Sequence, residues 1–239
     1  MRDDKGELHM KKQMYCAIIG DINQSRALPE RAKIQRKFQN AIDIVNREYK
    51  EEIASKFILT LGDEFQGLLH RATESYRLVR RFQDIMVGVP FAFGIGIGSL
   101  ATSLKKEALG MDGECFHFAR AALQQAKKKK REVIFSFDGE ASKLTNALVG
   151  LLEKEWGKLT PRQREIVQLL KKHKPNEITK KLKISRQAVW KTSKTTLVSQ
   201  MNDAEGALRD FLRTLIWISM DNYQVNHKRV TSSKSTILD

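Results

Sequence analysis

The sequence predicts an α+β protein, with a mixed N-terminal domain followed by a domain made only of helices. Three observations lead to this prediction. Up to Gly139, short apolar runs bounded by turn residues alternate with amphipathic segments, which is typical of strands and helices in turn. From Ala141 onwards, apolar residues keep helical spacing only. The basic segment 159–201 contains strong helix-start signals.

The first predicted elements are a strand, a helix and a hairpin. Residues 14–22 form a short apolar run ending in Gly-Asp, as expected of a buried strand. From Pro29 to about Glu51, apolar residues recur every three or four positions and predict a helix. Residues 57–69 are two apolar runs around a central Gly-Asp, which predicts a β-hairpin because both residues tolerate turn dihedrals.

A second helix over 71–87 precedes a strand over 91–98 that has glycine at every second position. The period of two places these glycines on one face of the strand. A glycine face indicates that something packs very close to the backbone, and we expect a helix there, with a ligand as the alternative. A third helix over 115–130 and a strand over 133–137 follow.

The first six elements match the βαββαβ order of a ferredoxin-like domain, with helices on one face of an antiparallel sheet. The helical half then has a connecting helix, a helix-turn-helix and a further apolar helix. The predicted limits are a flexible arm at 1–13, the mixed domain at 14–139, the connecting helix at 140–158, the helix-turn-helix at 159–201, the apolar helix at 203–225 and a disordered tail at 226–239.

Acidic residues lie at two strand ends that this topology makes neighbours. Asp21 closes the first strand, and Asp63 and Glu64 lie in the hairpin turn. Two adjacent carboxylates favour a cation between them, and Mg²⁺ prefers carboxylate and phosphate oxygens. The loop Ile22–Ser25 has backbone N–H groups that suit phosphates near a helix N-terminus. Taken singly, each acid is also explained as a turn or cap residue.

The segment 159–201 has the pattern of a helix-turn-helix. Thr160 caps a first helix, a second starts at Asn176, and Ser185 caps a third that buries Val189, with Trp190 as a further candidate for partial burial. Arg and Gln at the start of a recognition helix suit base edges in the major groove, and lysines suit phosphates. The predicted DNA-contacting residues are Arg186, Gln187, Lys191, Lys194, Lys180 and Lys181.

Positive charge gathers in the same segment. The whole chain has 43 Lys and Arg, 28 Asp and Glu, and a net charge of +15. Residues 159–201 hold eleven basic and two acidic residues, a net charge of +9 in less than a fifth of the chain. Such concentration indicates a surface for a polyanion such as double-stranded DNA. The alternative is a solvated basic bundle or an oligomerisation module. The separate basic run 127–131 is expected to solvate a helix end.

Composition excludes several classes. No apolar run approaches the roughly 20 residues of a membrane-spanning helix, and the polar start is unlike a secretory signal. Two cysteines make no disulfide framework, and no Cys/His spacing suggests zinc. We expect a cytoplasmic protein without a membrane partner.

Four short motifs resemble those of class III nucleotide cyclases and diguanylate cyclases. The run Ala17–Ile22 is similar to the first metal-binding strand of the cyclases, and Leu61–Phe65 resembles the second-Asp hairpin and the GGDEF signature. The runs Gly94–Gly98 and Ala119–Leu123 resemble their later strand and helix. A cyclase-like domain joined to a helix-turn-helix at this length resembles the SatD family.

The resemblance implies roles for particular residues. The implied metal ligands are Asp21, Asp63 and the backbone carbonyl of Ile22, and the implied phosphate contact is Arg120. With the loop and hairpin, the nucleotide-binding residues become Asn23, Gln24, Ser25, Gly62 and Arg120. The chain departs from the cyclases where they carry a transition-state Asn and a base-reading Lys, because it has Phe116 and Leu59 there, and Leu61 replaces the first Gly of GGDEF. Such changes remove catalysis more readily than binding.

The sequence therefore predicts a dimeric, nucleotide-responsive transcription regulator that binds DNA and takes Mg²⁺ with a purine nucleotide. Cyclase-like sites form where two subunits meet, so ligand binding and dimer geometry would be linked. The apolar helix is either a second dimer contact or a cover for the helix-turn-helix core. The alternative function is a Mg-dependent nucleotide cyclase or nucleotidyltransferase with an accessory DNA-binding domain.

Overall fold

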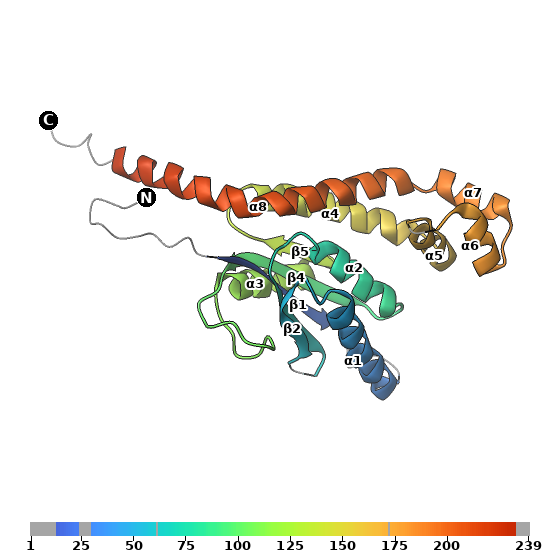
Figure 1. Ribbon diagram of the computed structural model, residues 1–239, viewed down its shortest axis with the longest axis horizontal. Helices are drawn as coiled ribbons and strands as arrows, with labels where there is room; N and C mark the ends of the chain where they lie inside the picture. Colours follow the sequence, from blue (N-terminus) through green and yellow to red (C-terminus); the bar gives the residue numbers. More distant parts are fainter. Residues whose placement is uncertain (1–12, 24–29, 61, 172, 233–239) are drawn as a thin grey trace. The chain divides into compact units, whose positions relative to one another are not determined.

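The computed structural model describes residues 13–23, 30–60, 62–171 and 173–232, and for 216–232 only the backbone. The chain divides into two compact units (Figure 1). Unit 1 comprises Met1–Ser142 with Phe211–Asp239, and unit 2 comprises Lys143–Asp210. The mixed domain and the helical domain expected from the sequence are both recognisable, but α8 (Val198–Ser232) belongs to both units.

Unit 1 contains one five-stranded sheet with the order β2-β3-β1-β4-β5. The first four strands pair antiparallel, and β5 joins β4 in parallel. The predicted βαββαβ order of the first six elements is confirmed. The elements are β1 (Met14–Ile22), α1 (Arg31–Glu48), β2 (Ile53–Leu59), β3 (Glu64–Leu69), α2 (Ser75–Ile85), β4 (Phe91–Ser99), α3 (Glu114–Lys129) and β5 (Val133–Ser136).

One face of the sheet is covered by α1 and α2 through an aromatic core. Phe38 of α1 and Phe82 of α2 pack on Phe65 of β3 and on Phe91 and Phe93 of β4. The rings of Phe65 and Phe82 stack with centroids 4.6 Å apart. All five are buried. The apolar stripes seen in the sequence therefore form the main core of this unit.

The other face of the sheet is covered by α3, which packs on the glycines of β4. A Cβ added at Gly94 would lie 2.9 Å from the Cα of Leu123, and one at Gly96 would lie 2.9 Å from the Cα of Ala119. Successive side chains of a strand point to opposite faces, so α3 lies opposite the phenylalanine core. The expected close approach to the glycine face is that of a helix. The two helices of the βαββαβ core, α1 and α2, share one face as expected, and α3 covers the other.

Unit 2 is helical, as expected. It contains α4 (Ala141–Lys158), α5 (Pro161–Leu170), α6 (Pro175–Leu182), α7 (Arg186–Thr195) and the start of α8. The Thr160 hydroxyl accepts from the Gln163 N–H at 3.2 Å, and the Gln163 side chain accepts from the Thr160 N–H at 2.9 Å. This capping box fixes the start of α5. Ile166, Ile178 and Val189 bring α5, α6 and α7 together in one small core.

The C-terminal helix differs from the predicted limits. Instead of ending a helix-turn-helix at 201 and a separate helix at 225, the chain forms one helix, α8, from Val198 to Ser232. The expectation of disorder is therefore wrong for 226–232, where no proline interrupts the helix, and residues 233–239 lie outside the described residues. Leu208, Leu212 and Leu215 are buried within the single chain. Of the predicted arm, only Gln13 is described.

Among the described helices, none combines the length and the apolar character needed to cross a bilayer.

Candidate ligand site and candidate nucleic-acid surface

The acidic residues predicted from the sequence lie at one end of the sheet, on neighbouring strands. Asp21 of β1 stands opposite Glu64 of β3 in the antiparallel register. The Ile22 N–H donates to the Asp63 carbonyl oxygen at 3.1 Å, so the hairpin residue lies beside the end of β1. Asp21 is 8% exposed, whereas Asp63 is half-buried. The structure thus places Asp21, Ile22 and Asp63 together, and their role as metal ligands stays a prediction.

Helix α3 brings two cations to these acids. The Lys127 ammonium pairs with Asp21 Oδ2, and the Arg120 guanidinium pairs with Glu64 Oε2. Lys127 follows Arg120 by seven positions, which is about two turns, so both emerge from the same side of the helix. Glu64 also accepts a hydrogen bond from the Thr60 hydroxyl at 3.1 Å. Two ion pairs therefore connect α3 to the ends of β1 and β3.

The sequence interpretation missed one of these partners. Lys127 was expected only to solvate the end of its helix, but it contacts Asp21, and burial lowers the pKa of its ammonium. The spacing of Arg120 and Lys127 is the signal that identifies it, because Ala119, Ala122 and Ala126, which occupy another side of the same helix, are all buried. Arg120 was predicted as a phosphate contact, and in the structure it contacts Glu64.

The loop after β1 offers less to a phosphate than expected. The backbone N–H of Ile22 donates to Asp63, and that of Asn23 donates to the Pro90 carbonyl oxygen at 2.9 Å. Neither N–H is therefore free for a ligand, which corrects the expectation for these two residues. Gln24 and Ser25 lie outside the described residues. Gly62 is exposed with φ +58°, a conformation that favours glycine, and nothing lies within 4 Å of its missing side chain.

The residues at this end of the sheet fit a divalent cation in part. Asp21 Oδ1 is buried and has no hydrogen-bond partner among the described residues. A buried carboxylate oxygen without a donor favours an incoming cation. Within the described part of the chain, however, no three His, Cys, Asp or Glu side chains gather closely enough to hold a metal by themselves. A cation here therefore depends on oxygen atoms that its ligand supplies.

A second surface lies on α7. Ser185 caps this helix by accepting from the Ala188 N–H at 3.1 Å, and Val189 and Thr192 face its core. The expectation that Trp190 is partly buried is wrong, because 63% of it is exposed. The outward residues follow helical spacing and form one stripe, which we call the α7 stripe: Arg186, Gln187, Trp190, Lys191 and Lys194.

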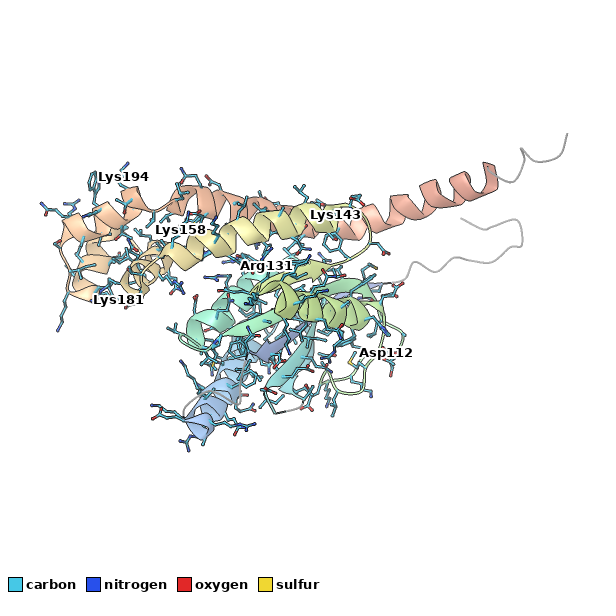
Figure 2. The ribbon with its side chains drawn as sticks, turned by 180° about the vertical axis from the view of Figure 1, so that it is seen from behind. Asp112, Arg131, Lys143, Lys158, Lys181 and Lys194 are labelled. Carbon is cyan, nitrogen blue, oxygen red and sulfur yellow. The ribbon has the colours of Figure 1, made fainter. Side chains whose placement is uncertain are left out.

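The α7 stripe contains no acidic residue, and α6 adds basic residues nearby in unit 2. Lys180 and Lys181 are exposed in the last turn of α6. Figure 2 shows Lys181 and Lys194 on the surface of the helices of this unit. All six side chains predicted to contact DNA are therefore exposed to solvent. An indole among basic groups offers an apolar contact beside charged ones.

A family model described as the SatD family matches residues 15–201. No curated protein matches the chain. Among solved structures, a bacterial light-regulated adenylyl cyclase is similar with a TM-score of 0.39 and 13% identity, over 58% of this chain and 81% of the other. The catalytic core of a rhodopsin-guanylyl cyclase in complex with ATPalphaS is similar with a TM-score of 0.34 and 13% identity, over 47% of this chain and 72% of the other. Likeness at this level assigns no function.

Proposed function

This chain belongs to the SatD family, and we propose that it is a nucleotide-responsive DNA-binding regulator that acts as a homodimer in the cytoplasm. The observation that carries the proposal is the α7 stripe. It presents three basic residues, a glutamine and an exposed indole on one capped helix. These groups suit the edges and phosphates of duplex DNA.

The three helices α5 to α7 support a helix-turn-helix interpretation. They share one small apolar core, and α6 and α7 are joined by a short turn in which Lys183 adopts φ 52°. In a helix-turn-helix the second helix of the pair lies in the major groove with its N-terminal residues at the bases. Arg186 and Gln187 occupy that position in α7, while Lys180 and Lys181 of α6 are available to phosphates.

The ion pairs at the ends of β1 and β3 are the candidate ligand site. We propose that Asp21, Asp63 and the Ile22 carbonyl hold Mg²⁺ and that Arg120 contacts a phosphate of a purine nucleotide. When bound, Mg²⁺ supplies positive charge that neutralises the phosphates. For this, Arg120 must exchange Glu64 for the phosphate, and its 44% exposed side chain is accessible to a ligand. The exchange gives a ligand a direct way to alter the contacts of α3.

The second candidate function is a Mg-dependent cyclase or nucleotidyltransferase, favoured by the same acids. Phe116 argues for binding without turnover, because this residue is only 7% exposed and has no group that stabilises charge. Incubation with nucleoside triphosphates and Mg²⁺ separates the two functions. Product whose formation is abolished in Asp63→Ala supports the enzyme, whereas nucleotide binding without product supports the regulator.

DNA binding is tested by the salt dependence of affinity for duplex DNA. If five basic side chains neutralise phosphates, affinity falls roughly 500-fold between about 50 and 200 mM salt. The double variant Lys180→Gln/Lys181→Gln is expected to reduce the slope by about two. Its control, Lys128→Gln/Lys129→Gln, removes the same charge from exposed positions of α3 and should leave the slope unchanged. Affinity that does not respond to salt contradicts phosphate contacts.

Nucleotide binding is tested by thermal unfolding with and without Mg²⁺. A ligand at about 100 times its dissociation constant adds about 2.7 kcal/mol to the stability of the folded chain. Purine nucleotides are expected to raise the melting temperature of the wild type and to have a smaller effect on Arg120→Ala. A screen in which no purine nucleotide shifts the transition contradicts the ligand half of the proposal.

A further inference from the structure

The position of Lys127 is fixed by the way α3 packs on the sheet. The helix lies directly on Gly94 and Gly96 of β4, where added Cβ atoms would meet its backbone. Its buried residues face the strands, so its rotation about its own axis is fixed as well. Lys127 is consequently held beside the end of β1 by packing that does not involve its own side chain.

The two oxygens of the Asp21 carboxylate have different surroundings. Oδ2 pairs with the Lys127 ammonium, while Oδ1 is buried and has no hydrogen-bond partner among the described residues. A buried acceptor without a donor is costly, since it has lost water and gained nothing. Asp21 is therefore only half satisfied by Lys127, and the unpartnered oxygen is the feature that points to a ligand.

Lys127 is able to leave this pair. Its side chain is 44% exposed, whereas that of Asp21 is 11% exposed, so the lysine reaches the buried acid from solvent. Four flexible bonds allow an ammonium to swing back to water without a change in the backbone. The neighbouring Lys128 and Lys129 are exposed on the same helix end, where a released lysine is solvated like them.

We propose that the Lys127 ammonium is an internal counter-ion of Asp21 and that a divalent cation enters this site only by displacing it. The inference rests on the ligand site proposed above and deepens it, because it names what holds the site before the cation arrives. An ammonium and a divalent ion on one carboxylate repel each other, so the occupancy of one excludes the other. Cation binding then releases a helix side chain, which links the ligand site to α3.

The test is direct Mn²⁺ binding to the full-length protein, measured by the loss of the free-ion electron paramagnetic resonance signal without nucleotide. Lys127→Gln keeps a hydrogen-bond donor and removes the charge, and it is expected to bind Mn²⁺ at least about tenfold more tightly than the wild type. Lys128→Gln removes the same charge one residue away, where no ion pair to Asp21 exists, and should stay within about twofold of the wild type. Adding Asp21→Asn to Lys127→Gln should abolish the gain.

Lys127→Met serves as a second variant if Lys127→Gln unfolds, and circular dichroism in chelator shows which variants are folded. Equal Mn²⁺ affinity of the wild type and a folded Lys127 variant overturns the inference, as does an equal gain in Lys128→Gln. Failure of the proposed function looks different. If purine nucleotides do not stabilise the wild type while the Lys127 variant gains Mn²⁺ affinity, the nucleotide proposal fails and the counter-ion stands; the opposite pattern leaves nucleotide binding and removes the counter-ion.

Discussion

Substitution of Gly94 by alanine tests how closely α3 approaches the sheet. The new Cβ would lie 2.9 Å from the Cα of Leu123 and closer still to the Ala119 carbonyl oxygen, where an ordinary contact is 3.4–4 Å. The obstacle is helix backbone, so the helix itself must move by about half an ångström or more. Overpacking of this kind costs about 1–3 kcal/mol. Because the obstacle is rigid backbone, we take the upper end of this range, and the reduced freedom of the unfolded chain offsets about 0.5–1 kcal/mol of it, which leaves a net loss of about 2 kcal/mol.

The assay is equilibrium unfolding in urea followed by circular dichroism. With a slope of about 2 kcal/mol per molar urea, the midpoint of Gly94→Ala is expected about 1 M below that of the wild type. A shift of α3 also displaces Arg120 and Lys127, so the variant should respond less to nucleotide. Gly157→Ala is the matched control, because this helical glycine of unit 2 has nothing within 4 Å of an added Cβ. It should gain about 0.5–1 kcal/mol. If Gly94→Ala is as stable as the wild type, α3 does not rest on the glycine face.

Further predictions concern the α7 stripe and the buried thiols. Arg186→Ala should cost about 1–3 kcal/mol on the preferred DNA sequence and relax sequence preference; equal loss on random DNA would show that this side chain contacts no base. Trp190→Ala should weaken the preferred site about tenfold with an unchanged salt slope, since an indole carries no charge. Burial raises the pKa of Cys115 to about 11 and that of Cys16 further above its ordinary value. Both thiols should resist Ellman's reagent until urea unfolds the chain, and reaction of either thiol in the folded protein at pH 8 argues against its burial. The stability that the neutral form of Cys115 contributes should be lost as the pH rises from about 9 towards 11, and that of Cys16 only at higher pH.

Much of the fold followed from the sequence because local patterns and packing agree. Apolar periodicity identified the strands and helices of unit 1, and Thr160 with Pro161 identified the start of α5. The glycine face of β4 predicted a close neighbour, and α3 is that neighbour. Which helix covers that face was not predictable from periodicity, because periodicity shows that a face is buried but not which element covers it.

The candidate site was predictable only in part. It was predictable that Asp21 and Asp63 lie at the same end of the sheet, because the topology makes their strands neighbours. The partner of Asp21 is 106 residues away in sequence, in a basic run that resembles any solvated helix end. Trp190 was considered for the inner side, whereas its place between Arg186 and Lys194 on the helical wheel puts it outside. A charge pair between distant segments depends on tertiary geometry that spacing alone does not supply, whereas the exposure of Trp190 follows from its helical spacing.

Nucleotide binding and DNA binding are expected to be coupled in this chain. This coupling is tested most directly by fluorescence anisotropy of a labelled DNA duplex that the protein has selected from a random pool. The duplex is titrated with the protein at fixed salt, once with and once without saturating purine nucleotide and Mg²⁺. The affinity for DNA is expected to change at least about fivefold, a coupling of roughly 1 kcal/mol, and the change should vanish in Arg120→Ala. Identical DNA affinity under both conditions, with the nucleotide shown to be bound, would contradict the account.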